Sequence, residues 1–279
     1  MRSVLITGAS TGIGEACAIY LAKQEWRVFA GVRKQADAKR LARAAPGIFS
    51  IVLDVTKSRQ IARAVKTVRK QVGKDGLQGL VNNAGIAIAG PLEFLPIDEL
   101  RLQMEVNFIG QVEVTQAFLP LLRAGGGRVV NISSVSGRVA TPLILPYTAS
   151  KFALEAFTDA LRRELLPWKL HVVSVQPGAI ATPIWKKSLK RGDTLQARLP
   201  RQAEALYGPL MERVRRVTKR SGANGIPAEK VARVVLNALT EPRPRTRYIV
   251  GRGTRFSIGL ARWLPDQWMD WLITRVLYR

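Results

Sequence analysis

Short apolar segments alternate with longer segments of helical periodicity along most of this chain. The apolar segments are predicted strands, and they occupy residues 2–6, 27–32, 49–53, 128–132, 170–175 and 247–250, with one more that opens at residue 80. Predicted helices occupy residues 36–45, 59–72, 100–122, 147–165 and 228–239, and another follows the first strand. Strands and helices that alternate in this way form a parallel sheet covered on both faces. We therefore predict an α/β fold with a single doubly wound parallel sheet.

Length and residue usage narrow the class of protein further. A chain of 279 residues is long enough for one large α/β domain with a full core. Cys17 is the only cysteine, which excludes an internal disulfide and a cysteine-based zinc site and fits a reducing compartment. His171 is the only histidine and lies in a predicted strand, so we expect no histidine triad and no metal site. We find no signal peptide and no apolar stretch long enough to span a bilayer, and we expect a cytoplasmic protein.

A glycine-rich turn joins the first predicted strand to the first helix. Residues 7–14 read TGASTGIG. Glycines between a strand and a helix allow a tight turn and let backbone N–H groups at the helix N-terminus approach a pyrophosphate. The turn therefore predicts a dinucleotide-binding site.

The ends of the second and third strands bear on which dinucleotide binds. A carboxylate after the second strand would bind the ribose hydroxyls of NAD, but this chain has Arg33 and Lys34 there, which suit the 2′-phosphate of NADP. We therefore expect NADP in preference to NAD. Asp54 follows the third strand, where it can either hydrogen-bond the adenine amino group or cap the helix that begins near Ser58.

Polar residues also follow the fourth and fifth strands. Residues 82–85 read Asn-Asn-Ala-Gly, in which the asparagines can tie neighbouring strands together and Gly85 lets a ribose lie close. Asn107 lies in a predicted apolar helix, where asparagine is unfavourable unless it makes a hydrogen bond. Ser134 follows the fifth strand at the carboxyl edge of the sheet, where open α/β folds bind ligands.

Tyr147 and Lys151 open the helix that follows this strand. Their spacing of four residues stacks both side chains on one helix face, so that an ammonium lies near a phenol. A phenol with a pKa of about 10 exchanges protons poorly at neutral pH, whereas a fixed cation favours its phenolate and suits it to general acid/base work. The same spacing arises by chance on many helices, so the surrounding motifs decide its meaning.

These motifs, in chain order, match the pattern of a known family. They are Thr7-Gly8-x-x-x-Gly12-x-Gly14, Asn82-Asn83-Ala84-Gly85, Asn107, Ser134, Tyr147-x-x-x-Lys151 and Pro177-Gly178. The chain resembles a classical short-chain dehydrogenase/reductase over residues 3–251, and residues 147–164 are similar to the retinol and 17β-hydroxysteroid dehydrogenase branch. The resemblance implies a Rossmann-type domain and an NAD(P)-dependent oxidoreductase, commonly a homodimer or homotetramer.

The resemblance also implies a role for each matching position. Tyr147 is the expected acid/base, Ser134 polarises the substrate oxygen, and Asn107 positions a water in a proton relay to Lys151. Lys151 holds the nicotinamide ribose and lowers the pKa of Tyr147. The remaining cofactor contacts expected are Gly8, Ser10, Gly12, Ile13 and Gly14 at the pyrophosphate and adenosine ribose, Arg33 at the 2′-phosphate, Asp54 at the adenine, Asn83 at the adjoining ribose, and Pro177, Gly178, Ile180 and Thr182 near the nicotinamide.

Residues 184–226 interrupt the alternation of strands and helices. Apolar residues recur there at near-helical spacing between basic ones, and in the resembling family this region is the substrate lid. Ordinary packing on the domain would give the same pattern. The expected walls of the pocket are Ala87, Ile88, Val135, Leu143, Ile144, Leu145 and Trp185. Their apolar character predicts that the substrate is a small lipophilic alcohol or ketone such as a steroid, retinoid or long-chain carbonyl. We expect the catalytic domain to comprise residues 1–253.

Residues 254–279 are an amphipathic C-terminal extension rich in tryptophan and arginine. The apolar positions are Phe256, Ile258, Leu260, Trp263, Leu264, Trp268, Met269, Trp271, Leu272, Ile273, Val276 and Leu277, and the arginines are Arg255, Arg262, Arg275 and Arg279, with Arg252 just before the segment. Such a segment is too short and polar to span a membrane but suits its interface, while docking on its own domain or on a partner subunit would give the same pattern. A formal net charge of +24 favours an anionic membrane surface, and hence a peripheral location.

The same net charge raises two competing functions. A nucleic-acid-binding module would explain it, but the basic residues are scattered over many predicted helices and form no recognition motif, so we expect no specific nucleic acid. A membrane-recruited, NADP-sensing scaffold would keep the glycine turn. It has no use for Ser134, Tyr147 and Lys151 together.

Overall fold

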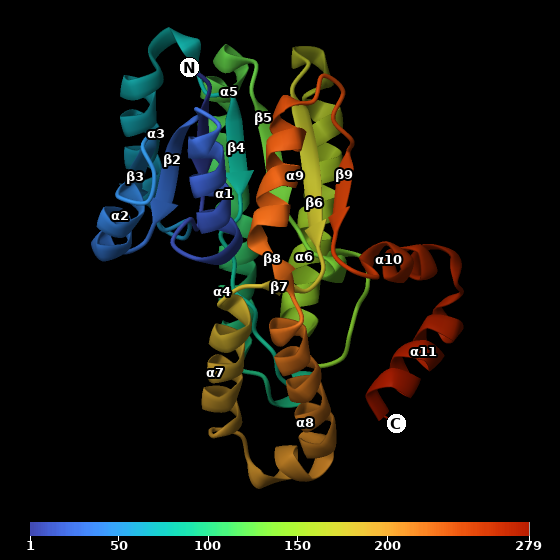
Figure 1. Ribbon diagram of the computed structural model, residues 1–279. Helices are drawn as coiled ribbons and strands as arrows, with labels where there is room; N and C mark the ends of the chain where they lie inside the picture. Colours follow the sequence, from blue (N-terminus) through green and yellow to red (C-terminus); the bar gives the residue numbers. More distant parts are fainter. Residues whose placement is uncertain (279) are drawn as a thin grey trace.

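One parallel sheet forms the centre of the molecule (Figure 1). The computed structural model describes the backbone of residues 1–278 and the side-chain surroundings of residues 1–275. The strands of the sheet are β1 (Ser3–Ile6), β2 (Arg27–Val32), β3 (Ile48–Val52), β4 (Gly79–Asn82), β5 (Arg128–Ile132), β6 (His171–Pro177) and β9 (Arg247–Val250). They lie in the order β3-β2-β1-β4-β5-β6-β9, and all neighbours are parallel. This order confirms the predicted doubly wound sheet.

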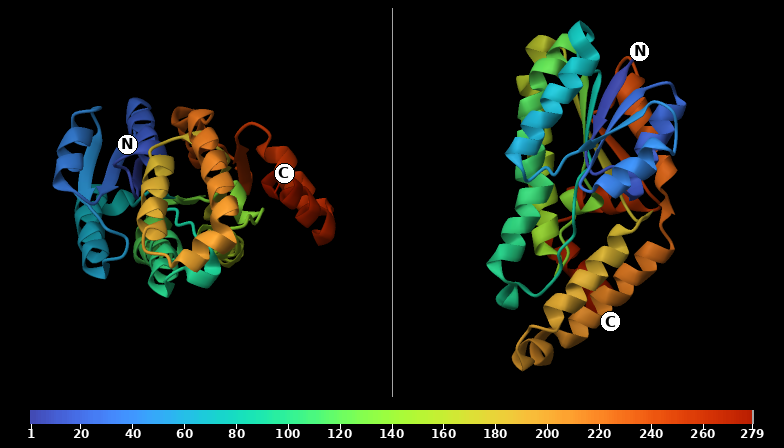
Figure 2. Two further views of the ribbon diagram at one scale, coloured as in Figure 1. Left: turned by 90° about the horizontal axis from the view of Figure 1, so that it is seen from below. Right: turned by 90° about the vertical axis from the view of Figure 1, so that its left-hand side faces the viewer.

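Helices cover both faces of the sheet (Figure 2). One layer consists of α1 (Gly12–Lys23), α2 (Gln35–Ala42) and α9 (Ala228–Thr240), and the other of α3 (Ser58–Val72), α5 (Gly110–Gly125) and α6 (Leu145–Glu164). Because side chains alternate along a strand, Val4 and Ile6 of β1 enter the first core and Leu5 enters the second. Strands that are buried on both faces in this way are almost continuously apolar, which is why their positions could be read from the sequence.

The helix predicted at residues 100–122 is interrupted. The structure has α4 (Ile97–Met104), a π-helical turn (Glu105–Ile109) and then α5. Asn107 lies in the π turn and is fully buried. Gly110 follows it at a close approach, since a Cβ there would lie 2.6 Å from the carbonyl oxygen of Val55. A π turn re-aims the side chains it carries and is frequent at functional sites, but an amphipathic pattern does not reveal it.

A helical hairpin extends from the carboxyl edge of the sheet (Figure 1). It consists of α7 (Ile184–Gln196) and α8 (Arg201–Ala223), and its base is closed by the pairing of β7 (Ile180–Ala181) with β8 (Ile226–Pro227). Trp185 fixes this base, because its indole Nε1 donates to the carbonyl of Ile180 at 2.6 Å and Gly222 of α8 packs on its ring. The near-helical spacing of apolar residues in this region therefore does mark helices.

The C-terminal extension is present as two helices beside the sheet (Figures 1 and 2). They are α10 (Thr254–Trp263) and α11 (Asp266–Tyr278). Their large aromatic side chains are exposed, by 71% for Phe256, 80% for Trp263, 62% for Trp268 and 52% for Trp271. Within residues 1–278, no helix combines the length and apolar character needed to cross a membrane. Residue Arg279 and the side chains of Val276 and Leu277 lie outside the described residues.

Candidate active site

The hydroxyls of Ser134 and Tyr147 meet beyond the carboxyl end of β5. Ser134 is buried and caps a short 3-10 turn, in which its Oγ accepts a hydrogen bond from the backbone N–H of Ser136 at 3.1 Å. Tyr147 lies in the first turn of α6. Pro146 precedes it in the same turn, which is a favourable place for proline in a helix. The Ser134 hydroxyl is near enough to the Tyr147 phenol to lower its pKa. The structure therefore brings the two side chains into one polar pair.

Lys151 lies one turn further along α6 as a buried cation. Its side chain donates from Nζ to the carbonyl of Ile132 at 2.8 Å, and the same nitrogen lies 5.8 Å from the centroid of the Tyr147 ring. Burial lowers the pKa of Lys151 from 10.5 to about 8, while the carboxylate of Glu155 raises it. Lys151 therefore loses its proton at a lower pH than an ordinary lysine does.

The pKa of Tyr147 is raised rather than lowered. Burial raises it above the ordinary value, and the hydrogen bond with Ser134 opposes that effect. The sequence had indicated Lys151 as the group that lowers this pKa. In the structure the Lys151 ammonium is directed to the Ile132 carbonyl, and Ser134 is the group that favours the ionised phenol.

Asn107 fixes the chain that leaves β4. Its Oδ1 accepts from the N–H of Ile86 at 2.9 Å, and its Nδ2 donates to the Ile86 carbonyl at 3.0 Å. The same Nδ2 donates to the hydroxyl of Ser150 at 3.1 Å, and that hydroxyl donates to the Tyr147 carbonyl at 2.7 Å. Asn107 thus connects the turn after β4 to the first turns of α6, which carry Tyr147 and Lys151.

The glycine turn is packed so tightly that side chains would not fit. Gly8 and Gly12 have positive φ angles of 64° and 66°, and a Cβ on Gly8 would lie 2.7 Å from the Cα of Ala84. A Cβ on Gly14 would lie 2.4 Å from Nδ2 of Asn83. That Nδ2 donates to the carbonyls of Thr7 and Gly8 at 2.9 and 3.0 Å. Asn83 therefore shapes the turn, a structural role beyond the ribose contact expected from the sequence.

Asp54 and Arg33 lie at the ends of their strands, as the sequence placed them. Oδ1 of Asp54 accepts from the N–H and the hydroxyl of Thr56 at 3.0 and 2.9 Å, which closes a local turn before α3. The N-cap of α3 is Lys57, so Asp54 is not the cap of that helix. Arg33 is exposed directly after β2.

Arg40 was missed by the sequence analysis. This residue of α2 forms an ion pair with Glu15 of α1 and donates from Nη2 to the carbonyl of Ser10 at 2.5 Å. It therefore places a positive charge beside the glycine turn. Arg40 and Glu15 are 25 positions apart and lie in different helices, so their spacing in the sequence does not predict that they pair. The one available signal was Glu15 itself, an acidic residue in the first turn of α1.

The residues after β6 lie between the glycine turn and the C-terminal extension. A Cβ on Gly178 would lie 2.3 Å from Oγ1 of Thr254, so this glycine is required by the start of α10. Pro177 is buried at the end of β6, and Ile180 is buried in β7. Thr182 packs on Gly12, whose added Cβ would lie 3.1 Å from Cβ of Thr182. The segment thus runs past the N-terminus of α1.

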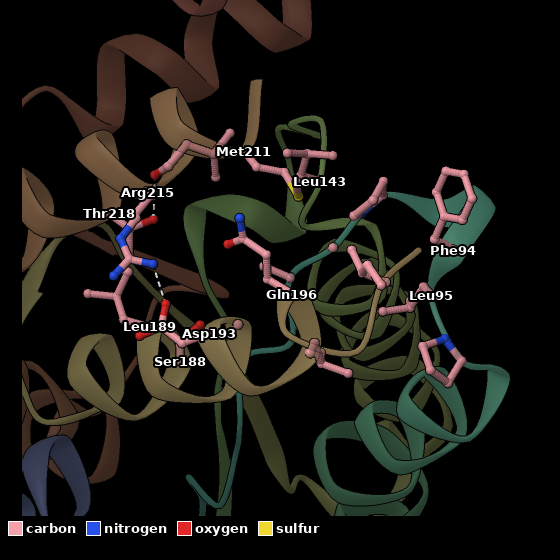
Figure 3. Close-up of a pocket in the computed structure, with 18 residues that line it drawn as sticks. Phe94, Leu95, Leu143, Ser188, Leu189, Asp193, Gln196, Met211, Arg215 and Thr218 are labelled. Atoms are coloured by element: carbon pink, nitrogen blue, oxygen red, sulfur yellow. Dashed lines mark hydrogen bonds and ion pairs between the residues drawn. The ribbon is translucent and has the colours of Figure 1, made fainter. Parts of the chain in front are cut away.

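A pocket opens between the hairpin and the loop after β4 (Figure 3). Its volume is about 680 Å³ including the open mouth. One side is apolar, with Phe94, Leu95 and Leu143, and the other carries the ion pair of Asp193 and Arg215. Leu143 is strained, with φ of 64°, and its carbonyl accepts from the N–H of Gly90 at 2.7 Å.

The walls of this pocket differ from those expected from the sequence. Of the seven expected wall residues, all of which the structure describes, Leu143 lines this pocket and the other six do not. Ile88 is fully buried, and Trp185 is directed to the Ile180 carbonyl. The hairpin itself supplies much of the lining, through residues such as Leu189, Leu195, Leu199, Met211 and Val214. Which faces of two amphipathic helices meet a loop depends on packing that the sequence pattern does not specify.

The residues at this edge of the sheet fit a dinucleotide. The glycines at 8, 12 and 14 let the turn pack directly on Ala84, Thr182 and Asn83, and α1 begins directly at this turn. Within the described structure the side chain of Thr11, the N-cap residue, does not cap the helix, which leaves its first N–H groups for a phosphate. A dinucleotide laid across this edge would bring its far end towards Tyr147 and Lys151.

A phenol and a serine hydroxyl beside a dinucleotide site are suited to hydride-transfer chemistry, and the fold and site accordingly indicate a nicotinamide-dependent oxidoreductase. The comparison with protein families makes this specific. The family model for short chain dehydrogenase matches residues 2–192, and the chain belongs to this family.

Individual relatives agree with the family. The chain is 38% identical to the NADPH-dependent 3-dehydrocapnine reductase of Ornithobacterium rhinotracheale, over 97% of this chain and 95% of that protein. It is 38% identical to mouse retinol dehydrogenase 5, over 99% of this chain and 89% of that protein.

 The chain is also 35% identical to bovine 17-beta-hydroxysteroid dehydrogenase type 6, over 98% of this chain and 88% of that protein. These relatives support a place in the retinol and 17β-hydroxysteroid dehydrogenase branch.

A solved structure agrees with the fold. The short chain dehydrogenase of Burkholderia cenocepacia in complex with NADP has a TM-score of 0.73 and 27% identity, and the similarity covers 99% of both chains. The overall fold is therefore that of a short chain dehydrogenase.

Proposed function

We propose that the protein transfers hydride between NADP and a lipophilic alcohol or ketone. One observation carries this proposal: the Ser134 hydroxyl favours the ionised form of the Tyr147 phenol, and the buried ammonium of Lys151 lies 5.8 Å from the tyrosine ring. A proton donor, an oxygen-polarising hydroxyl and a cation at the carboxyl edge of the sheet are the groups that reduction of a carbonyl requires.

Tyr147 is the proposed acid/base. In reduction its phenol gives the hydroxyl proton to the substrate oxygen, and in oxidation the phenolate takes the alcohol proton. Ser134 donates to the same oxygen and stabilises the charge that develops there. Lys151 is proposed to hold the nicotinamide ribose, and because burial lowers its pKa only to about 8, most of it is still charged at neutral pH. Asn107 is proposed to position a water between Lys151 and solvent.

The nicotinamide cofactor supplies the hydride when it is bound. Its proposed contacts with the chain are Gly8, Ser10, Gly12, Ile13 and Gly14 at the pyrophosphate and adenosine ribose, Asp54 at the adenine, Asn83 at the adjoining ribose, Pro177, Gly178, Ile180 and Thr182 near the nicotinamide, and Tyr147 and Lys151 at its ribose. The close packing of the glycine turn against Ala84 and Asn83 supports this set.

NADP is the proposed cofactor in preference to NAD. Arg33 is exposed directly after β2, and in folds of this type the adenosine ribose of the dinucleotide binds near the end of that strand. Arg40 adds positive charge beside Ser10. The name of one relative states that it is NADPH-dependent, and a solved relative binds NADP, which supports the same preference.

The proposed substrate is lipophilic, and the hairpin at residues 184–226 is its proposed lid on a catalytic domain of residues 1–253. The apolar side of the pocket, with Phe94, Leu95 and Leu143, supports this class. The names of these three relatives point to 3-dehydrocapnine, retinol and 17β-hydroxysteroids as the compounds on which those proteins act.

Two kinds of partner are part of the proposal. Ile109 and Phe152, in the helical layer of α5 and α6, are 47% and 43% exposed, which supports a homodimer or homotetramer built on that layer. The exposed tryptophans of α10 and α11 support a peripheral contact with an anionic membrane. An NADP-sensing scaffold is the competing function, and a specific nucleic acid partner is not proposed.

The test offers the protein retinal, steroid ketones, long-chain ketones and small polar carbonyls with NADPH or NADH. The absorbance of the reduced nicotinamide measures how fast each cofactor is oxidised. We expect turnover of an apolar carbonyl with NADPH faster than with NADH. Turnover confined to small polar carbonyls would contradict the substrate class. Cofactor binding without turnover of any compound would favour the scaffold.

A further inference from the structure

The first turn of α7 carries two lysines where cations are unfavourable. Lys186 and Lys187 follow the start of the helix at Ile184, and this turn holds no acidic residue. The N-terminus of a helix bears a partial positive charge, which destabilises a cation placed there. Departures from local preference of this kind concentrate at functional sites.

Lys187 reaches the glycine turn. Its Nζ donates to Oγ1 of Thr11 at 3.2 Å, although the two residues are 176 positions apart. Thr11 is the N-cap residue of α1. The ammonium therefore lies at the helix N-terminus at which a phosphate would bind, and in the described part of the chain the Thr11 hydroxyl is the one hydrogen-bond partner that it has.

The fold holds Lys187 in this place. The backbone N–H of Lys187 donates to the Pro183 carbonyl at 3.0 Å, which starts α7 directly after Thr182. Thr182 packs on Gly12, so the N-termini of α1 and α7 approach each other. Trp185 anchors the same turn of α7 to Ile180. The position of the ammonium follows from packed contacts on both sides.

The charges around this place are positive. Glu15 is the acidic residue in the first turn of α1, and it is paired with Arg40. Two helix N-termini and the ammonium of Lys187 thus surround the turn, and their fields add. A pyrophosphate, which carries two negative charges, complements this arrangement.

We propose that Lys187 contacts the pyrophosphate of the bound dinucleotide and couples the hairpin α7–α8 to cofactor binding. The proposal rests on the proposed function, which places a dinucleotide at this turn. The ammonium exchanges the hydroxyl of Thr11 for a phosphate oxygen. Ser188 and Leu189, the next residues of α7, line the pocket that is proposed to bind the substrate, so the cofactor would fix one wall of that pocket before the substrate enters.

The affinity for cofactor tests the contact. Tryptophan fluorescence is titrated with NADPH and with NADH in the full chain and in the variants Lys187→Met, Lys187→Arg and Lys186→Met. We expect Lys187→Met to lower the affinity for both cofactors by about tenfold, which is the effect of losing one charge-assisted contact at a solvent-exposed place. Lys187→Arg keeps the charge and Lys186→Met removes a neighbouring one, and both should stay within about twofold of the unmodified chain.

Three results would overturn the contact. A loss of affinity for NADPH alone would assign Lys187 to the 2′-phosphate. An equal loss of affinity in Lys186→Met would indicate a general effect of charge. An unchanged affinity in Lys187→Met would show that Lys187 does not contact the cofactor. If the unmodified chain binds neither cofactor, the proposed function itself fails, so the two failures are distinguishable.

Hydrogen exchange tests the coupling. NADPH should slow amide exchange in residues 184–196 of the unmodified chain and of Lys187→Arg, and should not do so in Lys187→Met when that variant is saturated with NADPH. Equal protection in Lys187→Met, or no protection in the unmodified chain, would contradict the coupling.

Discussion

At the scale of single residues, Lys151 is a cation in a place that disfavours charge. Burial lowers its pKa from 10.5 to about 8, and the carbonyl of Ile132 is its hydrogen-bond partner. Folding therefore weakens proton binding by Lys151, and the charged form costs stability at neutral pH. The shift corresponds to a cost on the order of 3 kcal/mol.

The stability of the protein should depend on pH through this residue. Because the folded pKa is the lower one, the cost is present in full below pH 8 and disappears as the pH rises towards 10.5. Relative to Lys151→Met, the free energy of unfolding of the unmodified chain should rise by about 1–3 kcal/mol between neutral and alkaline pH. Guanidinium unfolding of both proteins at the two pH values measures this. Parallel pH curves would contradict a buried, charged Lys151.

The sequence could predict which residues meet here, since the spacing of Tyr147 and Lys151 on a helix fixes their common face. It could not predict what sets their pKa values. The partner of Lys151 is a carbonyl in β5, and the group that favours the ionised Tyr147 is Ser134, which lies beyond that strand. Both contacts depend on how α6 packs on the sheet.

At the scale of elements, the glycine turn and the π turn bring the site together. A Cβ on Gly14 would lie 2.4 Å from Nδ2 of Asn83 and 2.5 Å from the carbonyl oxygen of Gly8. The turn was predictable, because glycines between a strand and a helix have few other uses. The π turn at Asn107 was not, because the apolar periodicity of residues 100–122 is the same with or without it.

Gly14→Ala should therefore destabilise the protein by about 1–3 kcal/mol, since its methyl group overpacks the turn. Gly259 in α10 is a matched control, because no atom lies within 4 Å of an added Cβ there. Gly259→Ala should stabilise the protein by about 0.5–1 kcal/mol, as expected for a helix interior. Thermal unfolding of both variants measures the difference. If Gly14→Ala were as stable as Gly259→Ala, the close packing of the turn would be wrong.

At the scale of the whole molecule, the hairpin and the C-terminal extension lie outside the sheet and its helices. The sequence predicted helices in both segments. It could not predict that Leu143 alone among the expected walls would line the pocket, or that Trp263, Trp268 and Trp271 would be exposed, because both depend on contacts between distant elements. The packing of Thr254 against Gly178 shows that the extension begins as part of the domain.

The exposed tryptophans allow a sharper test of membrane binding than removal of the extension, which would also remove Thr254. The triple variant Trp263→Ser, Trp268→Ser and Trp271→Ser should bind anionic vesicles at least about tenfold more weakly, because each indole contributes apolar area to the interface. Trp168 is 51% exposed elsewhere on the molecule, and Trp168→Ser is the control. Co-sedimentation measures the binding. Unchanged sedimentation of the triple variant would refute the membrane role.

The most direct test of the central claim is the Tyr147→Phe variant, which keeps the ring and removes the hydroxyl. With an apolar carbonyl that the unmodified chain reduces, turnover should fall by a factor on the order of 10²–10⁴, the usual contribution of general acid catalysis. The affinity for NADPH, measured by fluorescence titration, should fall by no more than about fivefold, because the variant removes one proposed ribose contact and leaves the glycine turn intact. Turnover equal to that of the unmodified chain would contradict the assignment of Tyr147 as the acid/base.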